Sequence, residues 1–195
     1  MDETRQTFLD ELYAHGRAHD EQREDRVARL RNVEPETAEL LGVLVRALQA
    51  RRVLEIGTSN GFSTIWLADA AEAVGGHVVS LEIEAARSAQ AAENVAEAGV
   101  ASFVELRVQD AGEALAAFGD AAFDLIFLDA ERPHYAGYWP DLVRVLRANG
   151  LLVVDGTLSH ARELVEFSEL VYADPGVTST LVTVGAGVQL IVKSP

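Results

Sequence analysis

A short apolar run, a turn with two glycines and the start of a helix follow one another in Val53-Leu54-Glu55-Ile56-Gly57-Thr58-Ser59-Asn60-Gly61-Phe62-Ser63. The run is typical of a buried strand, and the glycines let the backbone approach a ligand closely. A helix that begins after such a turn directs its positive N-terminal end at an anionic group. The spacing G-x-x-x-G-x-S differs from the dinucleotide fingerprint, and the chain has no Gly-Lys-Ser/Thr of a P-loop. The unit therefore predicts a ligand at the turn without identifying it.

The alternation of strand and helix continues along the chain. Apolar runs lie at 53–56, 78–81, 103–108, 125–128 and 151–154, and helical patterns lie at 62–73, 85–98, 112–118, 136–147 and 160–172. This spacing predicts right-handed βαβ units and a mostly parallel sheet covered on both faces. Two further runs, 180–184 and 188–192, are joined by Gly185-Ala186-Gly187 and predict an antiparallel C-terminal hairpin. We therefore predict a doubly wound α/β fold.

The N-terminal region has a different composition. Residues 1–31 are rich in charge, with Phe8, Leu9, Leu12 and Tyr13 at helical spacing, followed by Val27 and Leu30. We predict two short helices with a break near Gly16. The region is either a solvated extension or a lid or dimer contact over the site. The whole chain, 1–195, is expected to be a single domain in which 1–31 extends a core at 32–195.

Composition excludes several classes of site and partner. The 195 residues include no cysteine, which excludes disulfides, thiolate zinc sites, iron–sulfur clusters and cysteine nucleophiles. Sixteen basic against 31 acidic residues give a net charge of −15, which disfavours nucleic acid and anionic membranes as partners. The N-terminus opens with acids and lacks a signal-peptide core, so we expect a cytoplasmic protein.

Four acids each follow a predicted parallel strand: Glu82, Asp110, Asp129 and Asp155. They are expected to meet at the carboxyl edge of the sheet, where open α/β sheets bind ligands. Any one of them could simply cap the next helix. Together they would repel one another unless a ligand brings positive charge or several hydrogen-bond donors. S-adenosylmethionine offers a ribose diol, an adenine amine, an ammonium and a sulfonium, whereas NAD or ATP would bring phosphates to an acidic rim.

The stretch 53–63, the rim acids and the hairpin together resemble the class I S-adenosylmethionine-dependent O-methyltransferases of the catechol and caffeoyl-CoA type, over about residues 30–193. The resemblance implies a Rossmann-like sheet of seven strands and an enzyme that methylates a small phenolic or catecholic acceptor. It implies a cofactor turn shaped by Glu55, Gly57 and Gly61. The other implied cofactor contacts are Ser63 for the methionine carboxylate, Glu82 and Ile83 at the ribose, Asp110 and Ala111 at the adenine, Asp129 at the amino group, and Val33 in a covering segment.

The sequence departs from the family at the implied metal and base positions. Residues 129–135, Asp-Ala-Glu-Arg-Pro-His-Tyr, resemble an Asp-Ala-x-Lys-x-x-Tyr motif, so Arg132 replaces the lysine that acts as base. The metal site implied at Asp129 and Asp155 has Gly156 where the family has an oxygen ligand. Two carboxylates with waters could still hold Mg²⁺. Arg132 stays protonated and could orient an oxygen or stabilise a phenolate.

The remaining candidates for the base are histidines, because imidazole titrates near neutral pH. We take His134 as the catalytic candidate, with His160 as an alternative. The aromatic residues Tyr135, Tyr138 and Trp139 form either a wall for a planar acceptor or packing between a helix and the sheet. Two other functions stay open: a regulatory S-adenosylmethionine-binding protein without turnover, and a tRNA-modifying relative, which the net charge disfavours. A homodimer is expected from the amphipathic N-terminal region.

Overall fold

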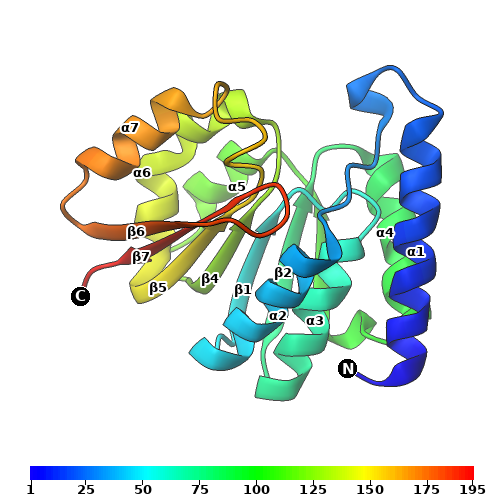
Figure 1. The fold of residues 1–195 in the computed structure, drawn as a ribbon. Coiled ribbons are helices and arrows are strands. Elements are labelled where there is room, and N and C mark those ends of the chain that lie inside the picture. The colour runs from blue at the N-terminus through cyan, green and yellow to red at the C-terminus, as the bar shows by residue number, and fades with distance from the viewer.

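The computed structural model describes residues 1–195, apart from the side chain of Val27. One sheet of seven strands runs through the molecule in the order β3-β2-β1-β4-β5-β7-β6 (Figure 1). The strands are β1 Arg52–Ile56, β2 His77–Glu82, β3 Val104–Val108, β4 Phe123–Leu128, β5 Leu146–Val154, β6 Val177–Val182 and β7 Val188–Lys193.

Seven α-helices cover the two faces of the sheet. They are α1 Glu3–Glu21, α2 Pro35–Leu48, α3 Phe62–Val74, α4 Ala85–Glu97, α5 Ala111–Ala117, α6 Tyr135–Val145 and α7 Val165–Ala173, with short 3₁₀ turns at Arg26–Ala28, Ala101–Phe103 and Arg132–His134. Side chains of α1 to α4 share one apolar core with the sheet, and those of α5 to α7 share the other. The predicted doubly wound, Rossmann-like fold is confirmed.

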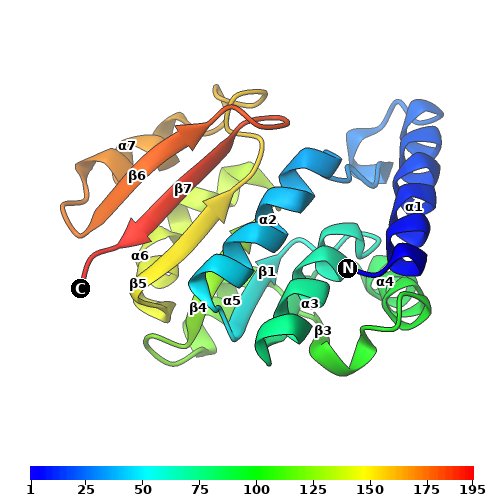
Figure 2. The same ribbon diagram turned by 60° about the horizontal axis from the view of Figure 1, so that its bottom comes forward.

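The central strands are apolar throughout because both of their faces are covered. Every residue of β4 is buried, and β4 pairs in parallel with β1 and β5. Strand β7 runs antiparallel to β5 and β6, so the predicted C-terminal hairpin is confirmed (Figure 2). Because β1 to β5 are parallel, their carboxyl ends reach the same edge.

The predicted break near Gly16 is wrong, because α1 is one continuous helix from Glu3 to Glu21. Gly16 is buried, and a Cβ atom there would collide with the side-chain amide of Asn32. The glycine therefore serves close packing and does not end the helix. The predicted second helix is reduced to the single 3₁₀ turn at Arg26–Ala28, and the side chain of Val27 lies outside the described part of the chain.

Two boundaries near the C-terminus also differ from the prediction. Helix α7 begins at Val165 and not at 160, because the residues before it form turns in which Glu163 N–H donates to His160 and Leu164 N–H to Ala161. Strand β6 ends at Val182, so the loop of the hairpin covers 183–187.

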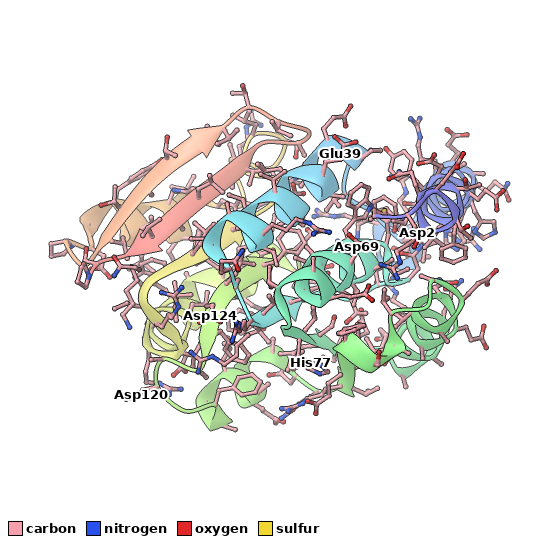
Figure 3. All side chains as sticks on the ribbon, turned by 90° about the horizontal axis from the view of Figure 1, so that it is seen from below. Asp2, Glu39, Asp69, His77, Asp120 and Asp124 are labelled. Carbon is pink, nitrogen blue, oxygen red and sulfur yellow. The ribbon has the colours of Figure 1, made fainter. Side chains whose placement is uncertain are left out.

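An acid at the opposite edge of the sheet has a structural role. The carboxylate of Asp124 accepts hydrogen bonds from the backbone N–H groups of Arg51 and Arg52, at 2.9 and 2.8 Å. The guanidinium of Arg147 donates to it at 2.7 Å. Figure 3 shows Asp124 in the view from below, at the N-terminal ends of the strands. This carboxylate joins β1, β4 and β5, whereas the four rim acids lie at the carboxyl edge.

Candidate functional site

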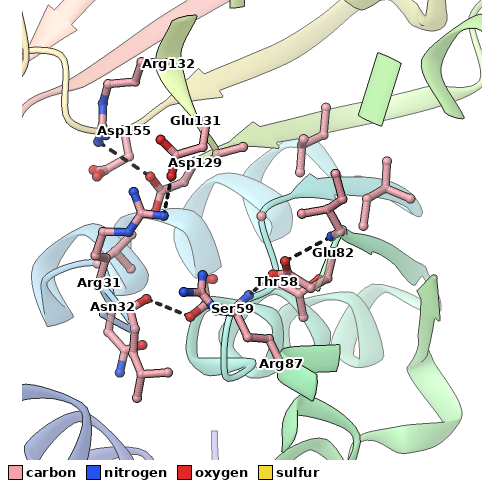
Figure 4. A pocket seen from close by; sticks show the side chains of 18 of the residues that line it. Arg31, Asn32, Thr58, Ser59, Glu82, Arg87, Asp129, Glu131, Arg132 and Asp155 are labelled. Atoms are coloured by element: carbon pink, nitrogen blue, oxygen red, sulfur yellow. Dashed lines mark hydrogen bonds and ion pairs between the residues drawn. The ribbon is translucent and has the colours of Figure 1, made fainter. Parts of the chain in front are cut away.

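A cavity of about 610 Å³ opens at the carboxyl edge of the sheet, as the rim of acids predicted. Its lining includes all four rim acids and the turn after β1. Figure 4 labels three of these acids, Glu82, Asp129 and Asp155. Residues 22–34, which we call the strap, supply the opposite side. Eleven of the thirteen residues implied as site residues line the cavity: Val33, Gly57, Ser63, Glu82, Ile83, Asp110, Ala111, Asp129, Arg132, His134 and Asp155. Glu55 does not line it and instead binds the hydroxyl of the lining residue Ser63. Gly61 lies in the same turn but does not line the cavity.

The turn after β1 requires glycine at its first position. Gly57 has a φ of +109°, and a Cβ atom there would overlap the backbone carbonyl oxygen of Asp129. Gly61 also has a positive φ, +86°, and lies against Ala91 of α4. The absence of a side chain at Gly57 therefore lets the end of β1 lie directly against the residue that follows β4, and the absence of one at Gly61 lets the turn pack on α4.

Beneath the turn, Glu55 is held in a network of hydroxyl groups. Its carboxylate is fully buried and accepts hydrogen bonds from Ser63 at 2.6 Å, Thr64 at 2.5 Å and Ser80 at 2.6 Å. Burial raises the pKa of Glu55 to about 7, although the three hydroxyl donors act in the opposite direction. The network fixes the first turn of α3, and it already uses the hydroxyl of Ser63 that was expected to bind a carboxylate.

The raised pKa of Glu55 predicts a stability that falls as pH rises. Folding raises this pKa from 4.5 to about 7, so the stabilisation from proton binding is full below pH 4.5 and is lost as pH passes through 7. We expect Glu55→Gln to remove up to about 3 kcal/mol of the pH-dependent part of the free energy of unfolding. Urea unfolding of both proteins at pH 5.5 and pH 8.5 measures it. If the variant and the wild type lost the same free energy of unfolding between the two pH values, the pH dependence would belong to groups other than Glu55.

The carboxylate of Glu82 is built into the end of β2. One oxygen accepts from the backbone N–H of Ser59 at 2.8 Å, and the other accepts from Ile83 and Glu84 at 3.0 Å each. The side chain is 7% exposed and lines the cavity. These three bonds use three of the roughly four acceptor positions of a carboxylate, so the oxygen that accepts from Ser59 can receive one further hydroxyl donor.

Farther along the rim, the residues expected to contact the adenine differ in their exposure and hydrogen bonding. Ile83 is 66% exposed and lines the cavity, so its apolar side chain is available to a ligand. Asp110 is exposed and caps α5 by accepting from Glu113 N at 3.0 Å, which is the role expected of a simple cap. Ala111 and Tyr138 line the cavity beside it.

Asp129 and Asp155 are a close acidic pair at the ends of β4 and β5. Burial raises the pKa of Asp129 to about 6, against the opposing effect of Arg132. Burial and the neighbouring Asp129 raise the pKa of Asp155 to about 8. One side-chain oxygen of Asp155, Oδ1, is buried and has no hydrogen-bond partner among the described residues. An unpartnered buried acceptor on a cavity wall indicates a place for a ligand's donor.

Arg132 lies beside this pair. Its side chain is 7% exposed, and Nη2 lies 3.8 Å from Oδ1 of Asp129. The sequence left open whether Asp129 and Asp155, with waters, hold a divalent metal without the family's third oxygen ligand. Gly156 supplies no side-chain oxygen, and the described residues contain no group of three or more His, Cys, Asp or Glu that could hold a metal. A permanent cation also lies against the pair, so the donor set does not fit a divalent metal.

The two histidines lie in different parts of the cavity. His134 is exposed and its ring stacks on Tyr138, with ring centroids 6.0 Å apart. His160 is half-buried and its Nδ1 lies 2.7 Å from the hydroxyl of Ser159. Burial and the charge of Arg132 lower the pKa of His160, which leaves the imidazole neutral near pH 7.

Two of the three candidate aromatic residues do not reach the cavity. Tyr135 is fully buried, and Trp139 is 6% exposed. Both rings pack edge-on against Phe167 of α7. The prediction of an acceptor wall is therefore wrong for these two, because the face of α6 that carries them meets α7. Tyr138 alone of the three lines the cavity.

The sequence did not indicate how the strap is held over the cavity. The carboxylate of Asp20 accepts from the backbone N–H groups of Leu30 and Arg31, at 2.7 and 2.8 Å. The hydroxyl of Ser59 donates to the carbonyl of Leu30 at 2.7 Å. Ion pairs then connect the strap to the other wall, Arg31 with Glu131 at 2.6 Å and Arg26 with Glu163 at 3.2 Å.

The lid interpretation was made for residues 1–31, and these contacts agree with it only for the part from residue 22 onward; Val33 is buried in the cavity wall as expected. Helix α1, by contrast, is not a purely solvated extension, since Leu9 and Leu12 belong to the main apolar core. The arginines of the strap were missed because no helical or strand period marks that segment. No helix among the described residues has the length and apolar character needed to cross a membrane.

Comparison with known proteins agrees with this geometry. A model of the O-methyltransferase family matches residues 17–194. The chain is 40% identical over 134 residues to a catechol O-methyltransferase of Mycobacterium tuberculosis, an alignment that covers 69% of this chain and 60% of that protein. The chain spans 60% and 63% of the length of two such curated relatives.

Two solved structures are similar over the whole chain. The O-methyltransferase TomG of Streptomyces achromogenes, in complex with SAM, is 31% identical with a TM-score of 0.77, covering 100% of this chain and 91% of that chain. An O-methyltransferase of Bacillus cereus, in complex with SAH, is 27% identical with a TM-score of 0.78, covering 100% and 92%. The chain therefore belongs to the O-methyltransferase family.

Proposed function

We propose that the protein transfers the methyl group of S-adenosylmethionine to a hydroxyl oxygen of a small phenolic or catecholic acceptor. The observation that carries the proposal is the joint position of Glu82 and Asp129 on one cavity beside the glycine turn. Family membership and the cofactor complexes of TomG and of the Bacillus cereus enzyme support it.

The proposed function assigns the two ends of the cofactor to different parts of the cavity. The methionine end would lie at the turn of Gly57 and Gly61 and the start of α3 with Ser63, its ammonium facing Asp129. A ribose hydroxyl would donate to Glu82. The adenine would lie between the strap residue Val33 and the rim residues Ile83, Asp110 and Ala111.

Methyl transfer is an in-line displacement in which a C–O bond forms as the C–S bond breaks. The products are a methyl ether and S-adenosylhomocysteine, and the acceptor's proton must go to a base. Alignment of the two reactants is worth about 7–11 kcal/mol in favourable cases. The walls of the cavity and the strap supply that alignment, while a divalent metal does not fit the residues present.

Of the two histidines, we propose His160 as the group that takes the proton, because it is half-buried in the cavity lining and burial lowers its pKa, whereas His134 is exposed. We expect His160→Gln to lower kcat about 100-fold with little change in cofactor affinity. His134→Gln is the matched variant and should cost less. Turnover of both variants between pH 6 and pH 9 measures the effect. A larger loss in His134→Gln would assign the proton to that side chain.

The function itself is tested by calorimetric titration with S-adenosylmethionine, followed by mass spectrometry of a panel of phenols and catechols. Binding together with a mass gain of one methyl group supports an enzyme. Binding without turnover on any acceptor would favour the regulatory alternative, and no binding would overturn the proposal.

Two further expectations stay predictions. The chain over 1–195 is expected to be a single domain, and it is expected to form a homodimer, which light scattering would measure.

A further inference from the structure

Two buried side chains at the acceptor end of the cavity have hydrogen-bonding groups that the protein does not use. Arg132 and Asp155 are 7% and 5% exposed. Nε of Arg132 and Oδ1 of Asp155 have no partner among the described residues. Both residues line the cavity, and Figure 4 shows them with Asp129 on one wall. Unpartnered buried groups are costly, so a ligand that supplies a donor and an acceptor would be favoured there.

The guanidinium of Arg132 occupies space that is free because residue 156 is a glycine. A Cβ atom at Gly156 would collide with Nη2 of Arg132, and it would also lie within 3.3 Å of the Cζ and Nε atoms. A side chain at position 156 would therefore displace the guanidinium from the position that it occupies here. The glycine and the arginine are one coupled feature of this site, since the room left by the first is taken by the second.

Arg132, in the space beside Gly156, adds a positive charge to the site. A guanidinium is protonated at any working pH and has donors only. It lies 3.8 Å from Asp129, which is the distance at which a cation compensates a carboxylate. A divalent ion at Asp129 and Asp155 would meet this fixed positive charge at short range.

We propose that Arg132, in the room left by Gly156, is the resident cation of the site and the group that holds the acceptor's reacting oxygen. This inference rests on the proposed methyl transfer. As the hydroxyl loses its proton, negative charge develops on the oxygen and strengthens the hydrogen bond from the guanidinium. The unpartnered Oδ1 of Asp155 shares a hydrogen bond with the same hydroxyl before transfer.

The proposal defines an acceptor class. A metal ion can be chelated by two vicinal oxygens, whereas one hydrogen-bond donor needs only one oxygen. The second hydroxyl of a catechol is therefore dispensable here, and a monohydroxylated phenol is a sufficient acceptor. Wild-type protein should methylate a monophenol with kcat/KM within about tenfold of the matching catechol, and EDTA should leave the rate unchanged.

The first test removes the guanidinium. We expect Arg132→Met to lower kcat/KM about 100-fold, as the loss of one donor to a developing oxyanion does, without weakening cofactor binding. Arg132→Lys should recover part of the loss, because the ammonium restores the charge but not the planar fork. Arg162→Met is the matched control, since Arg162 is exposed and does not line the cavity. A similar loss in Arg162→Met, or no loss in Arg132→Met, would overturn the proposal.

The second test uses metal binding and does not depend on turnover. Wild-type protein titrated with Mn²⁺ should give no calorimetric heat of specific binding. The double variant Arg132→Met with Gly156→Asn removes the cation and adds an amide oxygen, and asparagine tolerates the positive φ of +72° at this position. We expect the double variant to gain Mn²⁺ binding.

The outcomes separate the two claims. Tight Mn²⁺ binding by the wild type, or turnover that EDTA abolishes, would overturn the role of Arg132 and leave the proposed methyl transfer intact. Absence of S-adenosylmethionine binding by the wild type would overturn the methyl transfer itself. Failure of the double variant to bind Mn²⁺ while it remains folded by circular dichroism would also count against the exclusion of a metal by the guanidinium.

Discussion

Asp129→Ala is expected to weaken binding of S-adenosylmethionine about 100-fold. In the proposed complex this carboxylate is the anionic partner of the cofactor's ammonium. Removing one member of a largely buried ion pair costs about 3–5 kcal/mol, and the value falls toward about 3 kcal/mol here because the Asp129 side chain is 20% exposed. The loss is increased because Arg132, 3.8 Å from Asp129, would then face the ammonium without the carboxylate between them.

A fragment of the cofactor makes the test specific. Methylthioadenosine has the adenine and ribose of the cofactor but no amino-acid group, so its affinity should be the same in the wild type and in Asp129→Ala. Asp129→Asn keeps the shape and a hydrogen-bond acceptor and should give an intermediate loss. Calorimetric titration of both ligands into the three proteins measures this. Equal weakening of methylthioadenosine would show that the substitution disturbs the whole cavity, and unchanged affinity for the cofactor would remove Asp129 from the binding site.

The parts of this molecule that could be predicted from sequence are those that depend on local periodicity. The strand runs and the acids that follow them place Glu82, Asp129 and Asp155 at one edge, because consecutive parallel strands have their carboxyl ends on the same side. The exchange of a lysine for Arg132 was visible only through the resemblance of residues 129–135 to the family's Asp-Ala-x-Lys-x-x-Tyr motif.

What could not be predicted depends on contacts between distant segments. The departures at 132 and 156 are separate in the sequence, and only the collision between a side chain at 156 and the guanidinium shows that they are one feature. Gly16 was interpreted as a break because its partner, Asn32, is outside the helix. Tyr135 and Trp139 have helical spacing, which is the same for a face that contacts a ligand and for a face that packs on a helix. Periodicity therefore could not predict that both rings pack on Phe167.

Gly57→Ala is expected to destabilise the fold by about 3 kcal/mol or more and to abolish cofactor binding. Two costs add at this position. A positive φ costs a residue with a Cβ atom about 1–2 kcal/mol, and φ is +109° at Gly57. The new Cβ atom would also overlap the carbonyl oxygen of Asp129, which is backbone and has no rotamer by which to move away. Strands β1 and β4 would have to separate at the point where the ammonium is expected to bind.

Gly75→Ala separates these two costs. Gly75 also has a positive φ, +67°, but a Cβ atom there would have no heavy atom within 4 Å. Its substitution should therefore cost only the conformational term, about 1 kcal/mol or a shift of about 2–4 °C in Tm. Thermal unfolding of the two variants is the measurement, with a shift of about 10 °C expected for Gly57→Ala. Equal shifts would mean that the turn yields without strain, and the close contact between β1 and β4 would then not be what shapes the cofactor site.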